Sequence, residues 1–223
     1  MIETVIFDIG NVLLKTYGYE GFYLIVAERL GLEKPSIVNL KDQIKPLRKQ
    51  FTGGKISKRE FYEVMMGLLK DNGADVSSIT ESDFYGTWNS SQFLGVNDGI
   101  AELCRELKNK EVELQILSNM SISAFDYIRN IYPTVFAMFN DMVISYAVGQ
   151  LKGDGTLDIY RTAFSRNRAK KPENCVFADD KKENVKEATQ YGFLGYHYDV
   201  PRLGYDSGAR EFREFLRMHR VLD

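Results

Sequence analysis

The sequence contains little cysteine, with only Cys104 and Cys175 among 223 residues. Each has an apolar neighbour within a largely apolar segment, which favours buried thiols in a reducing compartment and argues against a disulfide framework. The chain also lacks any run of about 18 uncharged apolar residues, so no membrane-spanning helix is predicted. The N-terminal residues MIETVIF have no basic segment followed by a long apolar stretch, as a secretory signal would. We therefore expect a soluble, cytoplasmic protein.

Neither sign of charge dominates, because 29 basic and 31 acidic residues give a formal net charge of -2. This balance offers no broad electrostatic basis for binding nucleic acid or an anionic membrane, and no obligate protein partner is evident. Small molecules are the expected partners.

Histidine is as scarce as cysteine, with two residues in the chain. His197 lies near the last predicted strand and His219 in the last predicted helix, so a serine or cysteine triad lacks a base and both histidines are expected to be structural.

The sequence does contain an alternation of short apolar runs and amphipathic helical patterns, which predicts a doubly wound α/β fold with a parallel sheet. A chain of this length can bury a substantial core without disulfides. The runs that are typical of buried strands span residues 4–10, 112–119, 174–180 and 193–199, with a further strand around 142–146. Helical periodicity covers residues 100–110, 183–192 and 211–223.

The interval from residue 17 to 96 departs from this alternation. It shows helical patterns at 22–31, 57–73 and 82–89 but no persuasive strand. We therefore predict an α/β core formed by residues 1–16 and 97–223, and an inserted helical domain formed by residues 17–96. Turn-prone residues at both edges of the insertion could form hinges.

Polar residues stand where the predicted strands end, and ligands bind at the carboxyl ends of strands in open α/β sheets. Taken singly, each has an ordinary explanation as a helix cap, a solvated lysine or an acidic first turn. These residues are Asp8, Ser118, Asn119, Asp179 and Asp180, with Lys152 in the segment that follows the strand predicted around 142–146.

Together the polar residues indicate a site for a metal and a phosphate. Three carboxylates at one edge repel each other unless a cation lies among them, and Mg²⁺ is the hard, oxygen-preferring ion that suits such a cluster. Lys152 and the Ser118 hydroxyl could bind the remaining phosphoryl oxygens while one carboxylate attacks. An aspartate can act as a nucleophile by forming an aspartyl-phosphate.

The order of these residues resembles the haloacid dehalogenase superfamily, in particular its phosphatases with a helical cap. The likeness extends over essentially the whole chain and is carried by FDIGNVLL, ILSNMS and VFADDKKENVKEATQYG, which are similar to the first, second and fourth motifs of that family. Within the family, the sequence looks most like the α-D-glucose-1-phosphate phosphatase type and the phosphatase domain of soluble epoxide hydrolase. The resemblance implies a Rossmann-like core, an inserted cap and a Mg²⁺-dependent phosphatase acting on a small phosphorylated metabolite.

The resemblance also implies roles for individual residues. Asp8 would be the nucleophile and a metal ligand, and the backbone carbonyl of Gly10 would complete a metal contact. Ser118 and Lys152 would hold the phosphoryl group. Asp179 and Asp180 would bind Mg²⁺ directly or through water, in an order that the sequence leaves open. Further residues implied at the site are Asn119, Gly10 and Asn11 on the substrate side and Asn184 at the last loop.

Two positions depart from the family pattern. The family usually has a second aspartate where this chain has Gly10, and Lys-Pro where this chain has Lys152-Gly153. Lys15 and Lys170-Lys171 are therefore rivals of Lys152, although the latter pair precedes a strand and lies at the wrong end. A metal-independent dehalogenase, or a degenerate member that binds without turnover, stays open as an alternative. For the inner surface of the cap, the sequence offers Tyr17, Tyr19, Tyr23, Trp88 and Asn89.

Overall fold

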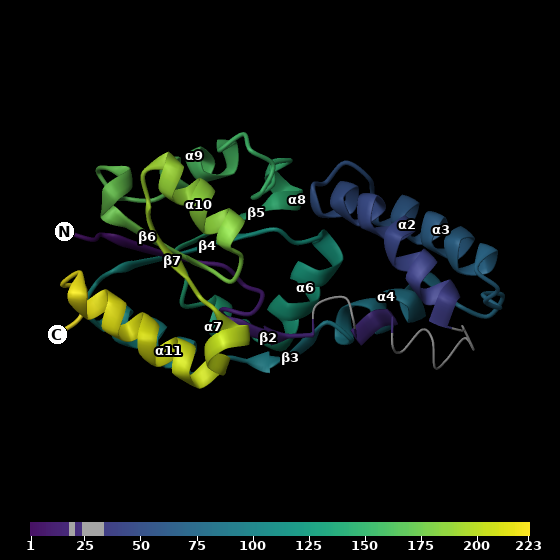
Figure 1. Ribbon diagram of the computed structural model, residues 1–223, viewed down its shortest axis with the longest axis horizontal. Helices are drawn as coiled ribbons and strands as arrows, with labels where there is room; N and C mark the ends of the chain where they lie inside the picture. The colour runs from purple at the N-terminus through teal and green to yellow at the C-terminus, as the bar shows by residue number, and fades with distance from the viewer. Residues whose placement is uncertain (18–20, 24–33) are drawn as a thin grey trace.

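The computed structural model describes residues 1–17, 21–23 and 34–223 of the chain. Its described part is built on a parallel sheet with the strand order β5-β4-β1-β6-β7 (Figure 1). The strands are β1 (Thr4–Phe7), β4 (Glu113–Ser118), β5 (Asp141–Ile144), β6 (Cys175–Asp179) and β7 (Leu194–His197). All five lie within or across the apolar runs that predicted them, so the predicted parallel α/β sheet is confirmed.

The register of the sheet brings three strand ends to one level. Phe7 at the end of β1 lies beside Ile116 of β4 and Ala178 of β6. One residue further along each strand come Asp8, Leu117 and Asp179. Because parallel strands exit at the same edge, Asp8 emerges between the ends of its two neighbours at the centre of the sheet.

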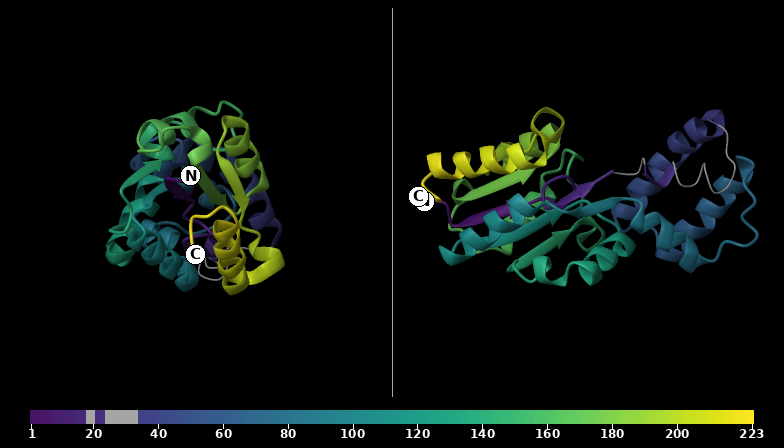
Figure 2. Two further views of the ribbon diagram at one scale, coloured as in Figure 1. Left: turned by 90° about the vertical axis from the view of Figure 1, so that its left-hand side faces the viewer. Right: turned by 90° about the horizontal axis from the view of Figure 1, so that it is seen from below.

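Helices cover both faces of the sheet (Figure 2). Alternate residues of β1 face the two layers. Val5 and Phe7 belong to the hydrophobic core shared with α5 (Asp98–Asn109), α6 (Ile122–Ile131), α7 (Pro133–Phe136) and α11 (Val200–Met218). Ile6 belongs to the core shared with α9 (Asp158–Ser165) and α10 (Lys182–Tyr191). The remaining short elements of the core are α8 (Ser145–Val148) and the single turn η1 (Pro172–Asn174).

The predicted ends of the helices agree with the structure in one case and differ in another. Helix α10 stops at Gly192, whose φ of 115° lies in the left-handed region that glycine adopts without strain. Helix α11 begins at Val200, well before the predicted pattern, because Asp199 caps it by accepting a hydrogen bond from the Arg202 N–H and because a break at Gly204 separates its first turn from the rest. Both cysteines are buried free thiols, as predicted.

Three helices pack together at one end of the molecule, and we call them the α2–α4 unit (Figure 1). They are α2 (Lys34–Thr52), α3 (Lys58–Asp71) and α4 (Glu81–Ser90). Ser57 and Thr80 begin α3 and α4 with capping boxes, each exchanging hydrogen bonds with an acidic residue three positions later. The unit has its own aromatic core, which includes Phe61, Phe84 and Trp88. The helices predicted at 57–73 and 82–89 are confirmed, whereas that at 22–31 lies largely outside the described residues.

The expectation of no strand between residues 17 and 96 is wrong at its end. Strand β3 (Phe93–Val96) pairs with β2 (Leu14–Thr16) in an antiparallel ribbon. A four-residue strand carries almost no periodicity, and its hydrogen-bonding partners lie about eighty residues away in the sequence. The ribbon lies between the sheet and the α2–α4 unit (Figure 2). Within the described ranges, no helix combines the length and the apolar character that crossing a membrane requires.

Candidate active site

A cavity of about 240 Å³ lies at the carboxyl edge of the sheet, where Asp8 emerges. Asp8 is 7% exposed, and its backbone N–H donates a 2.9 Å hydrogen bond to the Ala178 carbonyl, which fixes it against β6. Asp179 is fully buried behind the cavity wall. The other residues predicted for the site line this cavity, namely Asp8, Gly10, Asn11, Ser118, Asn119, Lys152 and Asp180, together with Asn184.

The Lys152 ammonium group lies between two carboxylates beneath the cavity. Its Nζ is 2.9 Å from Asp8 Oδ1 and 2.5 Å from Asp179 Oδ2, and it also donates a 2.9 Å hydrogen bond to the Leu117 carbonyl. Burial opposes the charge on Lys152, but the two carboxylates raise the pKa of its ammonium above the usual value. Lys152 therefore stays charged and balances two acids at the position where a phosphoryl group could be attacked.

The rival lysines lie elsewhere. The Lys15 ammonium is 5.7 Å from the ring centre of Tyr205, at the β2 ribbon. The Lys171 side chain is 69% exposed and pairs with Glu173, before the start of β6. The structure thus brings Lys152, and neither Lys15 nor Lys171, to the carboxylate of Asp8.

Three carboxylates meet the geometric requirement for a cation site. Oxygen atoms of Asp8, Asp179 and Asp180 all lie within 4.8 Å of one another, and such hard oxygen ligands fit Mg²⁺. Burial raises the pKa of Asp179 to about 6, although Lys152 acts against this. Burial and the neighbouring Asp8 also raise the pKa of Asp180. Both shifts reflect the cost of holding three acids together, and a bound cation would offset that cost.

The two acids that follow β6 have different surroundings. Asp179 accepts hydrogen bonds from Asn184 Nδ2 at both oxygens and from the Lys181 N–H, in addition to its pair with Lys152. Asp180 accepts one hydrogen bond of 2.9 Å, from Asn11 Nδ2, and faces the cavity. Asp180 therefore has more capacity left for a metal ion, while Asp179 is engaged in orienting Lys152.

The backbone turn after Asp8 is made by Asn11 and not by Gly10. Asn11 has a φ of 59°, whereas Gly10 is outside the left-handed region and a Cβ there would meet no atom within 4 Å. The backbone conformation therefore does not require a glycine at position 10. The Asn11 side chain orients Asp180 and is itself held, because its Oδ1 accepts hydrogen bonds from Thr16 Oγ1 and the Tyr205 hydroxyl.

The Asn119 side chain holds the backbone of Lys152. Its Nδ2 donates a 2.8 Å hydrogen bond to the Lys152 carbonyl, and its Oδ1 accepts a 2.9 Å hydrogen bond from the Lys152 N–H. The next residue, Met120, donates its N–H to the buried Ser145 hydroxyl, which in turn donates to the Thr52 carbonyl at 2.6 Å. Ser145 thus joins the loop after β4 to the α2–α4 unit. Sequence analysis missed Ser145, although its position directly after β5 was a signal of the same kind as the others.

Glu187 of α10 fixes the loop that follows Lys152. Its carboxylate accepts a 2.7 Å hydrogen bond from the Gly153 N–H and a 2.9 Å hydrogen bond from the Gly155 N–H. Gly153 has a φ of 79°, which proline cannot adopt, and proline also lacks the N–H that is donated here. The departure from Lys-Pro therefore has a physical counterpart, because Gly153 donates its N–H to a carboxylate and has a φ that proline cannot adopt.

Replacing Glu187 with alanine is expected to lower kcat about tenfold with little change in KM, because the loop that presents Lys152 loses two charge-assisted hydrogen bonds. The measurement is steady-state hydrolysis of an aryl phosphate. Glu183→Ala on the exposed side of the same helix is the control and should behave like the native protein. If Glu187 acts through Lys152, its removal should cost nothing further in a Lys152→Ala background, and additive losses would contradict this role.

The α2–α4 side of the cavity is formed by residues that sequence analysis did not identify. Arg48 of α2, Gln92 and Phe93 line it. None of the described candidates for the inner surface of the cap lines this cavity, and the expectation is wrong for Tyr17, Tyr23 and Trp88. Tyr17 is 61% exposed, and Tyr23 and Trp88 belong to the core of the α2–α4 unit. Tyr19 lies outside the described residues.

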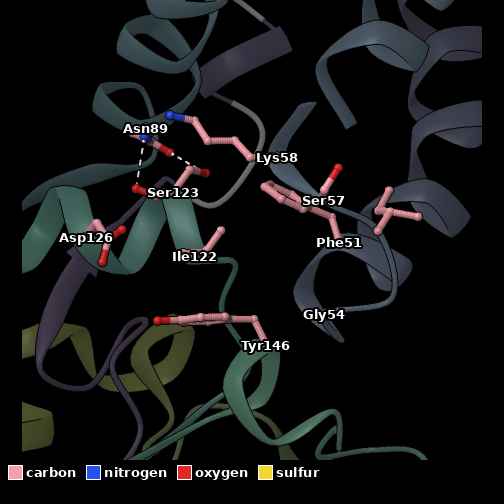
Figure 3. Close-up of a pocket in the computed structure, with 10 residues that line it drawn as sticks. Phe51, Gly54, Ser57, Lys58, Asn89, Ile122, Ser123, Asp126 and Tyr146 are labelled. Atoms are coloured by element: carbon pink, nitrogen blue, oxygen red, sulfur yellow. Dashed lines mark hydrogen bonds between the residues drawn. The ribbon is translucent and has the colours of Figure 1, made fainter. Parts of the chain in front are cut away.

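Asn89 lies at a different cavity, of about 370 Å³, between the α2–α4 unit and α6 (Figure 3). It donates a 3.1 Å hydrogen bond from Nδ2 to the Ser123 carbonyl, as the dashed lines in the figure show. A Cβ at Gly54 would lie 2.3 Å from the Tyr146 carbonyl, so the turn after α2 approaches the core closely on the same side. These contacts fix how the α2–α4 unit sits on the core.

Comparison with known proteins adds evidence on the fold. No protein-family model matches the chain, and no curated protein sequence does. Solved structures do match. A protein from Porphyromonas gingivalis that is described as a predicted HAD-like family hydrolase superposes with a TM-score of 0.73 and 20% identity, covering 99% of this chain and 98% of that one. The fold is that of the haloacid dehalogenase (HAD) enzymes.

Two further proteins of this fold bear on the chemistry of the site. A HAD-family enzyme from Bacteroides thetaiotaomicron, solved with magnesium, has a TM-score of 0.70 and 20% identity over 88% of this chain and 92% of its own. The same enzyme was also solved with magnesium and inorganic phosphate. A dehalogenase matches with a TM-score of 0.62 and 15% identity over 89% of this chain and 85% of its own. Neighbours with this fold therefore include an enzyme that binds magnesium and inorganic phosphate and a dehalogenase.

Proposed function

We propose that the protein is a Mg²⁺-dependent HAD-superfamily phosphatase that hydrolyses a small phosphorylated metabolite, with sugar phosphates as the first class to test. The observation that carries this proposal is the Lys152 ammonium held between Asp8 and Asp179 below a cavity that Asp180 also lines. Magnesium and inorganic phosphate bound to the Bacteroides enzyme support the same reading. The narrower likeness to glucose-1-phosphate phosphatases and the cytoplasmic location stay predictions.

Asp8 is the nucleophile in this proposal. Its carboxylate oxygen attacks phosphorus, a bond from Asp8 to phosphorus forms, and the bond from phosphorus to the leaving oxygen breaks. A water molecule then attacks the aspartyl-phosphate and releases inorganic phosphate, which restores the carboxylate. The Lys152 ammonium balances the negative charge that develops on the phosphoryl oxygens, and the Ser118 hydroxyl, which is at the cavity wall, donates a hydrogen bond to one of them.

The magnesium ion would be held by Asp8, Asp180 and the Gly10 carbonyl, and Asp179 would not bind it directly. This order follows from the hydrogen bonds that already engage both oxygens of Asp179. When bound, the ion balances the acidic cluster and attracts a phosphoryl oxygen. The side chain of Asn11 contributes by holding Asp180 in place.

The proposal is tested by hydrolysis of a chromogenic aryl phosphate with Mg²⁺ and with a chelator. Turnover that needs the metal is the expected result. Halide release from a 2-haloacid without metal, with no phosphate release, would replace this proposal with a dehalogenase. The glycine at position 10 favours that alternative, because a departing halide needs no proton and therefore no acidic side chain there. Asp180 opposes it, because its negative charge would repel the departing anion. No turnover in either assay would favour a degenerate binding protein.

The absence of a side chain at Gly10 predicts which phosphate esters react well. In the described part of the chain, position 10 offers no acidic side chain to a leaving oxygen, so leaving groups that depart as stable anions should be preferred, such as an aryl oxide or the anomeric oxygen of a sugar 1-phosphate. General acid assistance is typically worth about 10² to 10⁴ in rate, so ordinary alkyl phosphates should be poor substrates.

Gly10→Asp is expected to raise kcat/KM for alkyl phosphates by at least tenfold more than for aryl phosphates. The side chain has room, because a Cβ at this position meets nothing within 4 Å. Gly10→Asn is the matched control, since it has nearly the same shape but no acidic proton, and it should not rescue alkyl substrates. An equal rate on alkyl and aryl phosphates in the native protein would show that another group already supplies the proton.

A further inference from the structure

The cavity at the candidate active site has two walls with different chemistry. The core side supplies Asp8, Lys152 and Asp180, which suffice for a metal ion and one phosphoryl group. The opposite side includes Arg48, which comes from the last turns of α2 and is half-buried. Arg48 has an interaction within the protein, so its role toward a substrate depends on what its remaining N–H donors can bind.

Two carboxylates already balance the charge of Lys152. Lys152 is therefore poorly suited to bind an anionic group on the part of the substrate away from the reacting phosphoryl group. Arg48 differs from Lys152 in having five N–H donors in a planar fork, so a contact within the protein does not exhaust its hydrogen-bonding capacity. Such a fork binds carboxylates and phosphates through two parallel hydrogen bonds. Arg48 is therefore suited to recognise an anionic group on the leaving portion of the substrate.

The neighbouring residues define the remainder of this wall. Gln92 is 6% exposed, and its amide nitrogen donates a 2.7 Å hydrogen bond to the Trp88 carbonyl. The side-chain carbonyl oxygen of Gln92 can therefore accept a hydrogen bond from a substrate hydroxyl, but it cannot bind an anion. Phe93 adds an apolar surface beside it. The only other lysine that lines the described cavity besides Lys152 is Lys181, which is exposed to solvent and so contributes little binding energy.

Building on the proposed phosphatase function, we propose that the preferred substrates are phosphate monoesters with a second anionic group, a carboxylate or another phosphate, and that Arg48 binds this second group. The reacting phosphoryl lies on the Asp8 side and the second anion on the α2 side of the same cavity. Arg48 is then a specificity-determining residue supplied by the α2–α4 unit.

The test compares two aryl phosphates that differ in charge but have similar leaving-group acidity, 4-(carboxymethyl)phenyl phosphate and its methyl ester, in which a methylene group separates the carboxyl group from the ring. The native protein is expected to prefer the carboxylate by about tenfold or more in kcat/KM, the size of a charge-assisted hydrogen bond. Arg48→Met should abolish this preference. Lys49→Met removes the same charge from the exposed neighbouring position of α2 and should keep it, as should Lys181→Met. A bisphosphate compared with its monophosphate separates a phosphate preference from a carboxylate preference.

Several outcomes would overturn the inference while leaving the phosphatase intact. Equal kcat/KM for the acid and the ester in the native protein would show that no second anion is recognised. An equal loss on both substrates in Arg48→Met would show that Arg48 acts on the reacting phosphoryl group.

If no phosphate ester is hydrolysed at all, the proposed function fails. The inference is then tested by calorimetric binding of the same pair to Asp8→Asn, where affinity independent of the carboxylate would refute it.

Discussion

Asp8→Asn is expected to abolish phosphate ester hydrolysis, with a loss in kcat of at least about 10⁴ by comparison with nucleophile removal in other hydrolases. The amide keeps the shape of the side chain but loses both nucleophilicity and charge. The backbone hydrogen bond from residue 8 to Ala178 and the ion pair of Lys152 with Asp179 do not depend on this carboxylate. Folding and part of the affinity for phosphate should therefore persist, as measured by thermal unfolding and by calorimetry with inorganic phosphate.

The control for this substitution is Asp71→Asn at the exposed end of α3, which removes the same charge far from the cavity and should leave the rate unchanged. A rate in Asp8→Asn within tenfold of the native value would exclude Asp8 as the nucleophile. Chemical trapping adds a second observation. Brief reaction with substrate followed by acid quenching should leave phosphate covalently attached to the native protein but not to the variant.

Lys152→Ala is expected to lower kcat by about 10² or more, because a preorganised positive charge disappears from the place where negative charge develops. It should also destabilise the fold. Asp8 and Asp179 are both buried, and removing one partner from a buried ion pair typically costs about 3–5 kcal/mol. Mg²⁺ should recover part of this loss by replacing the ammonium as the compensating cation. The melting temperature with and without Mg²⁺ measures both effects.

Lys171→Ala is the matched control for Lys152, since its side chain is 69% exposed and its pair with Glu173 spans 3.7 Å. It should change neither the rate nor the melting temperature. A loss of less than about threefold in Lys152→Ala would point to a different lysine at the phosphoryl group. An unchanged melting temperature in that variant would show that water reaches and solvates the two carboxylates.

Local patterns predicted most of the core. Each buried strand is a short apolar run, and a run such as Val5-Ile6-Phe7 is apolar throughout because both faces of the sheet are covered by helices. The stop of α10 at Gly192 also follows from a local signal, because glycine adopts a left-handed backbone without strain. The strand ends were informative because parallel strands exit at one edge, which placed Asp8, Lys152 and Asp180 around one cavity.

Patterns failed where a feature depends on a distant partner. Strand β3 exists because Val96 pairs with Leu14, and neither segment is long enough to show a period. The role of Glu187 depends on α10 lying against the loop after Lys152, so nothing around residue 187 in the sequence signals it. Tyr23 and Trp88 were predicted for the inner surface of the cap, but their large apolar rings are buried in the core of the α2–α4 unit.

The sequence by itself therefore determined the α/β class, the order of the strands along the chain and the acids and lysine at their ends, because these follow from local periodicity and from the common exit edge of a parallel sheet. Only the tertiary structure decided that Lys152 lies between Asp8 and Asp179, that Asn11 holds Asp180 and that Arg48 of α2 forms the far wall of the cavity. The physical reason is that these are contacts between residues far apart in the chain. Such contacts are set by how helices and strands pack against each other, which no local pattern records.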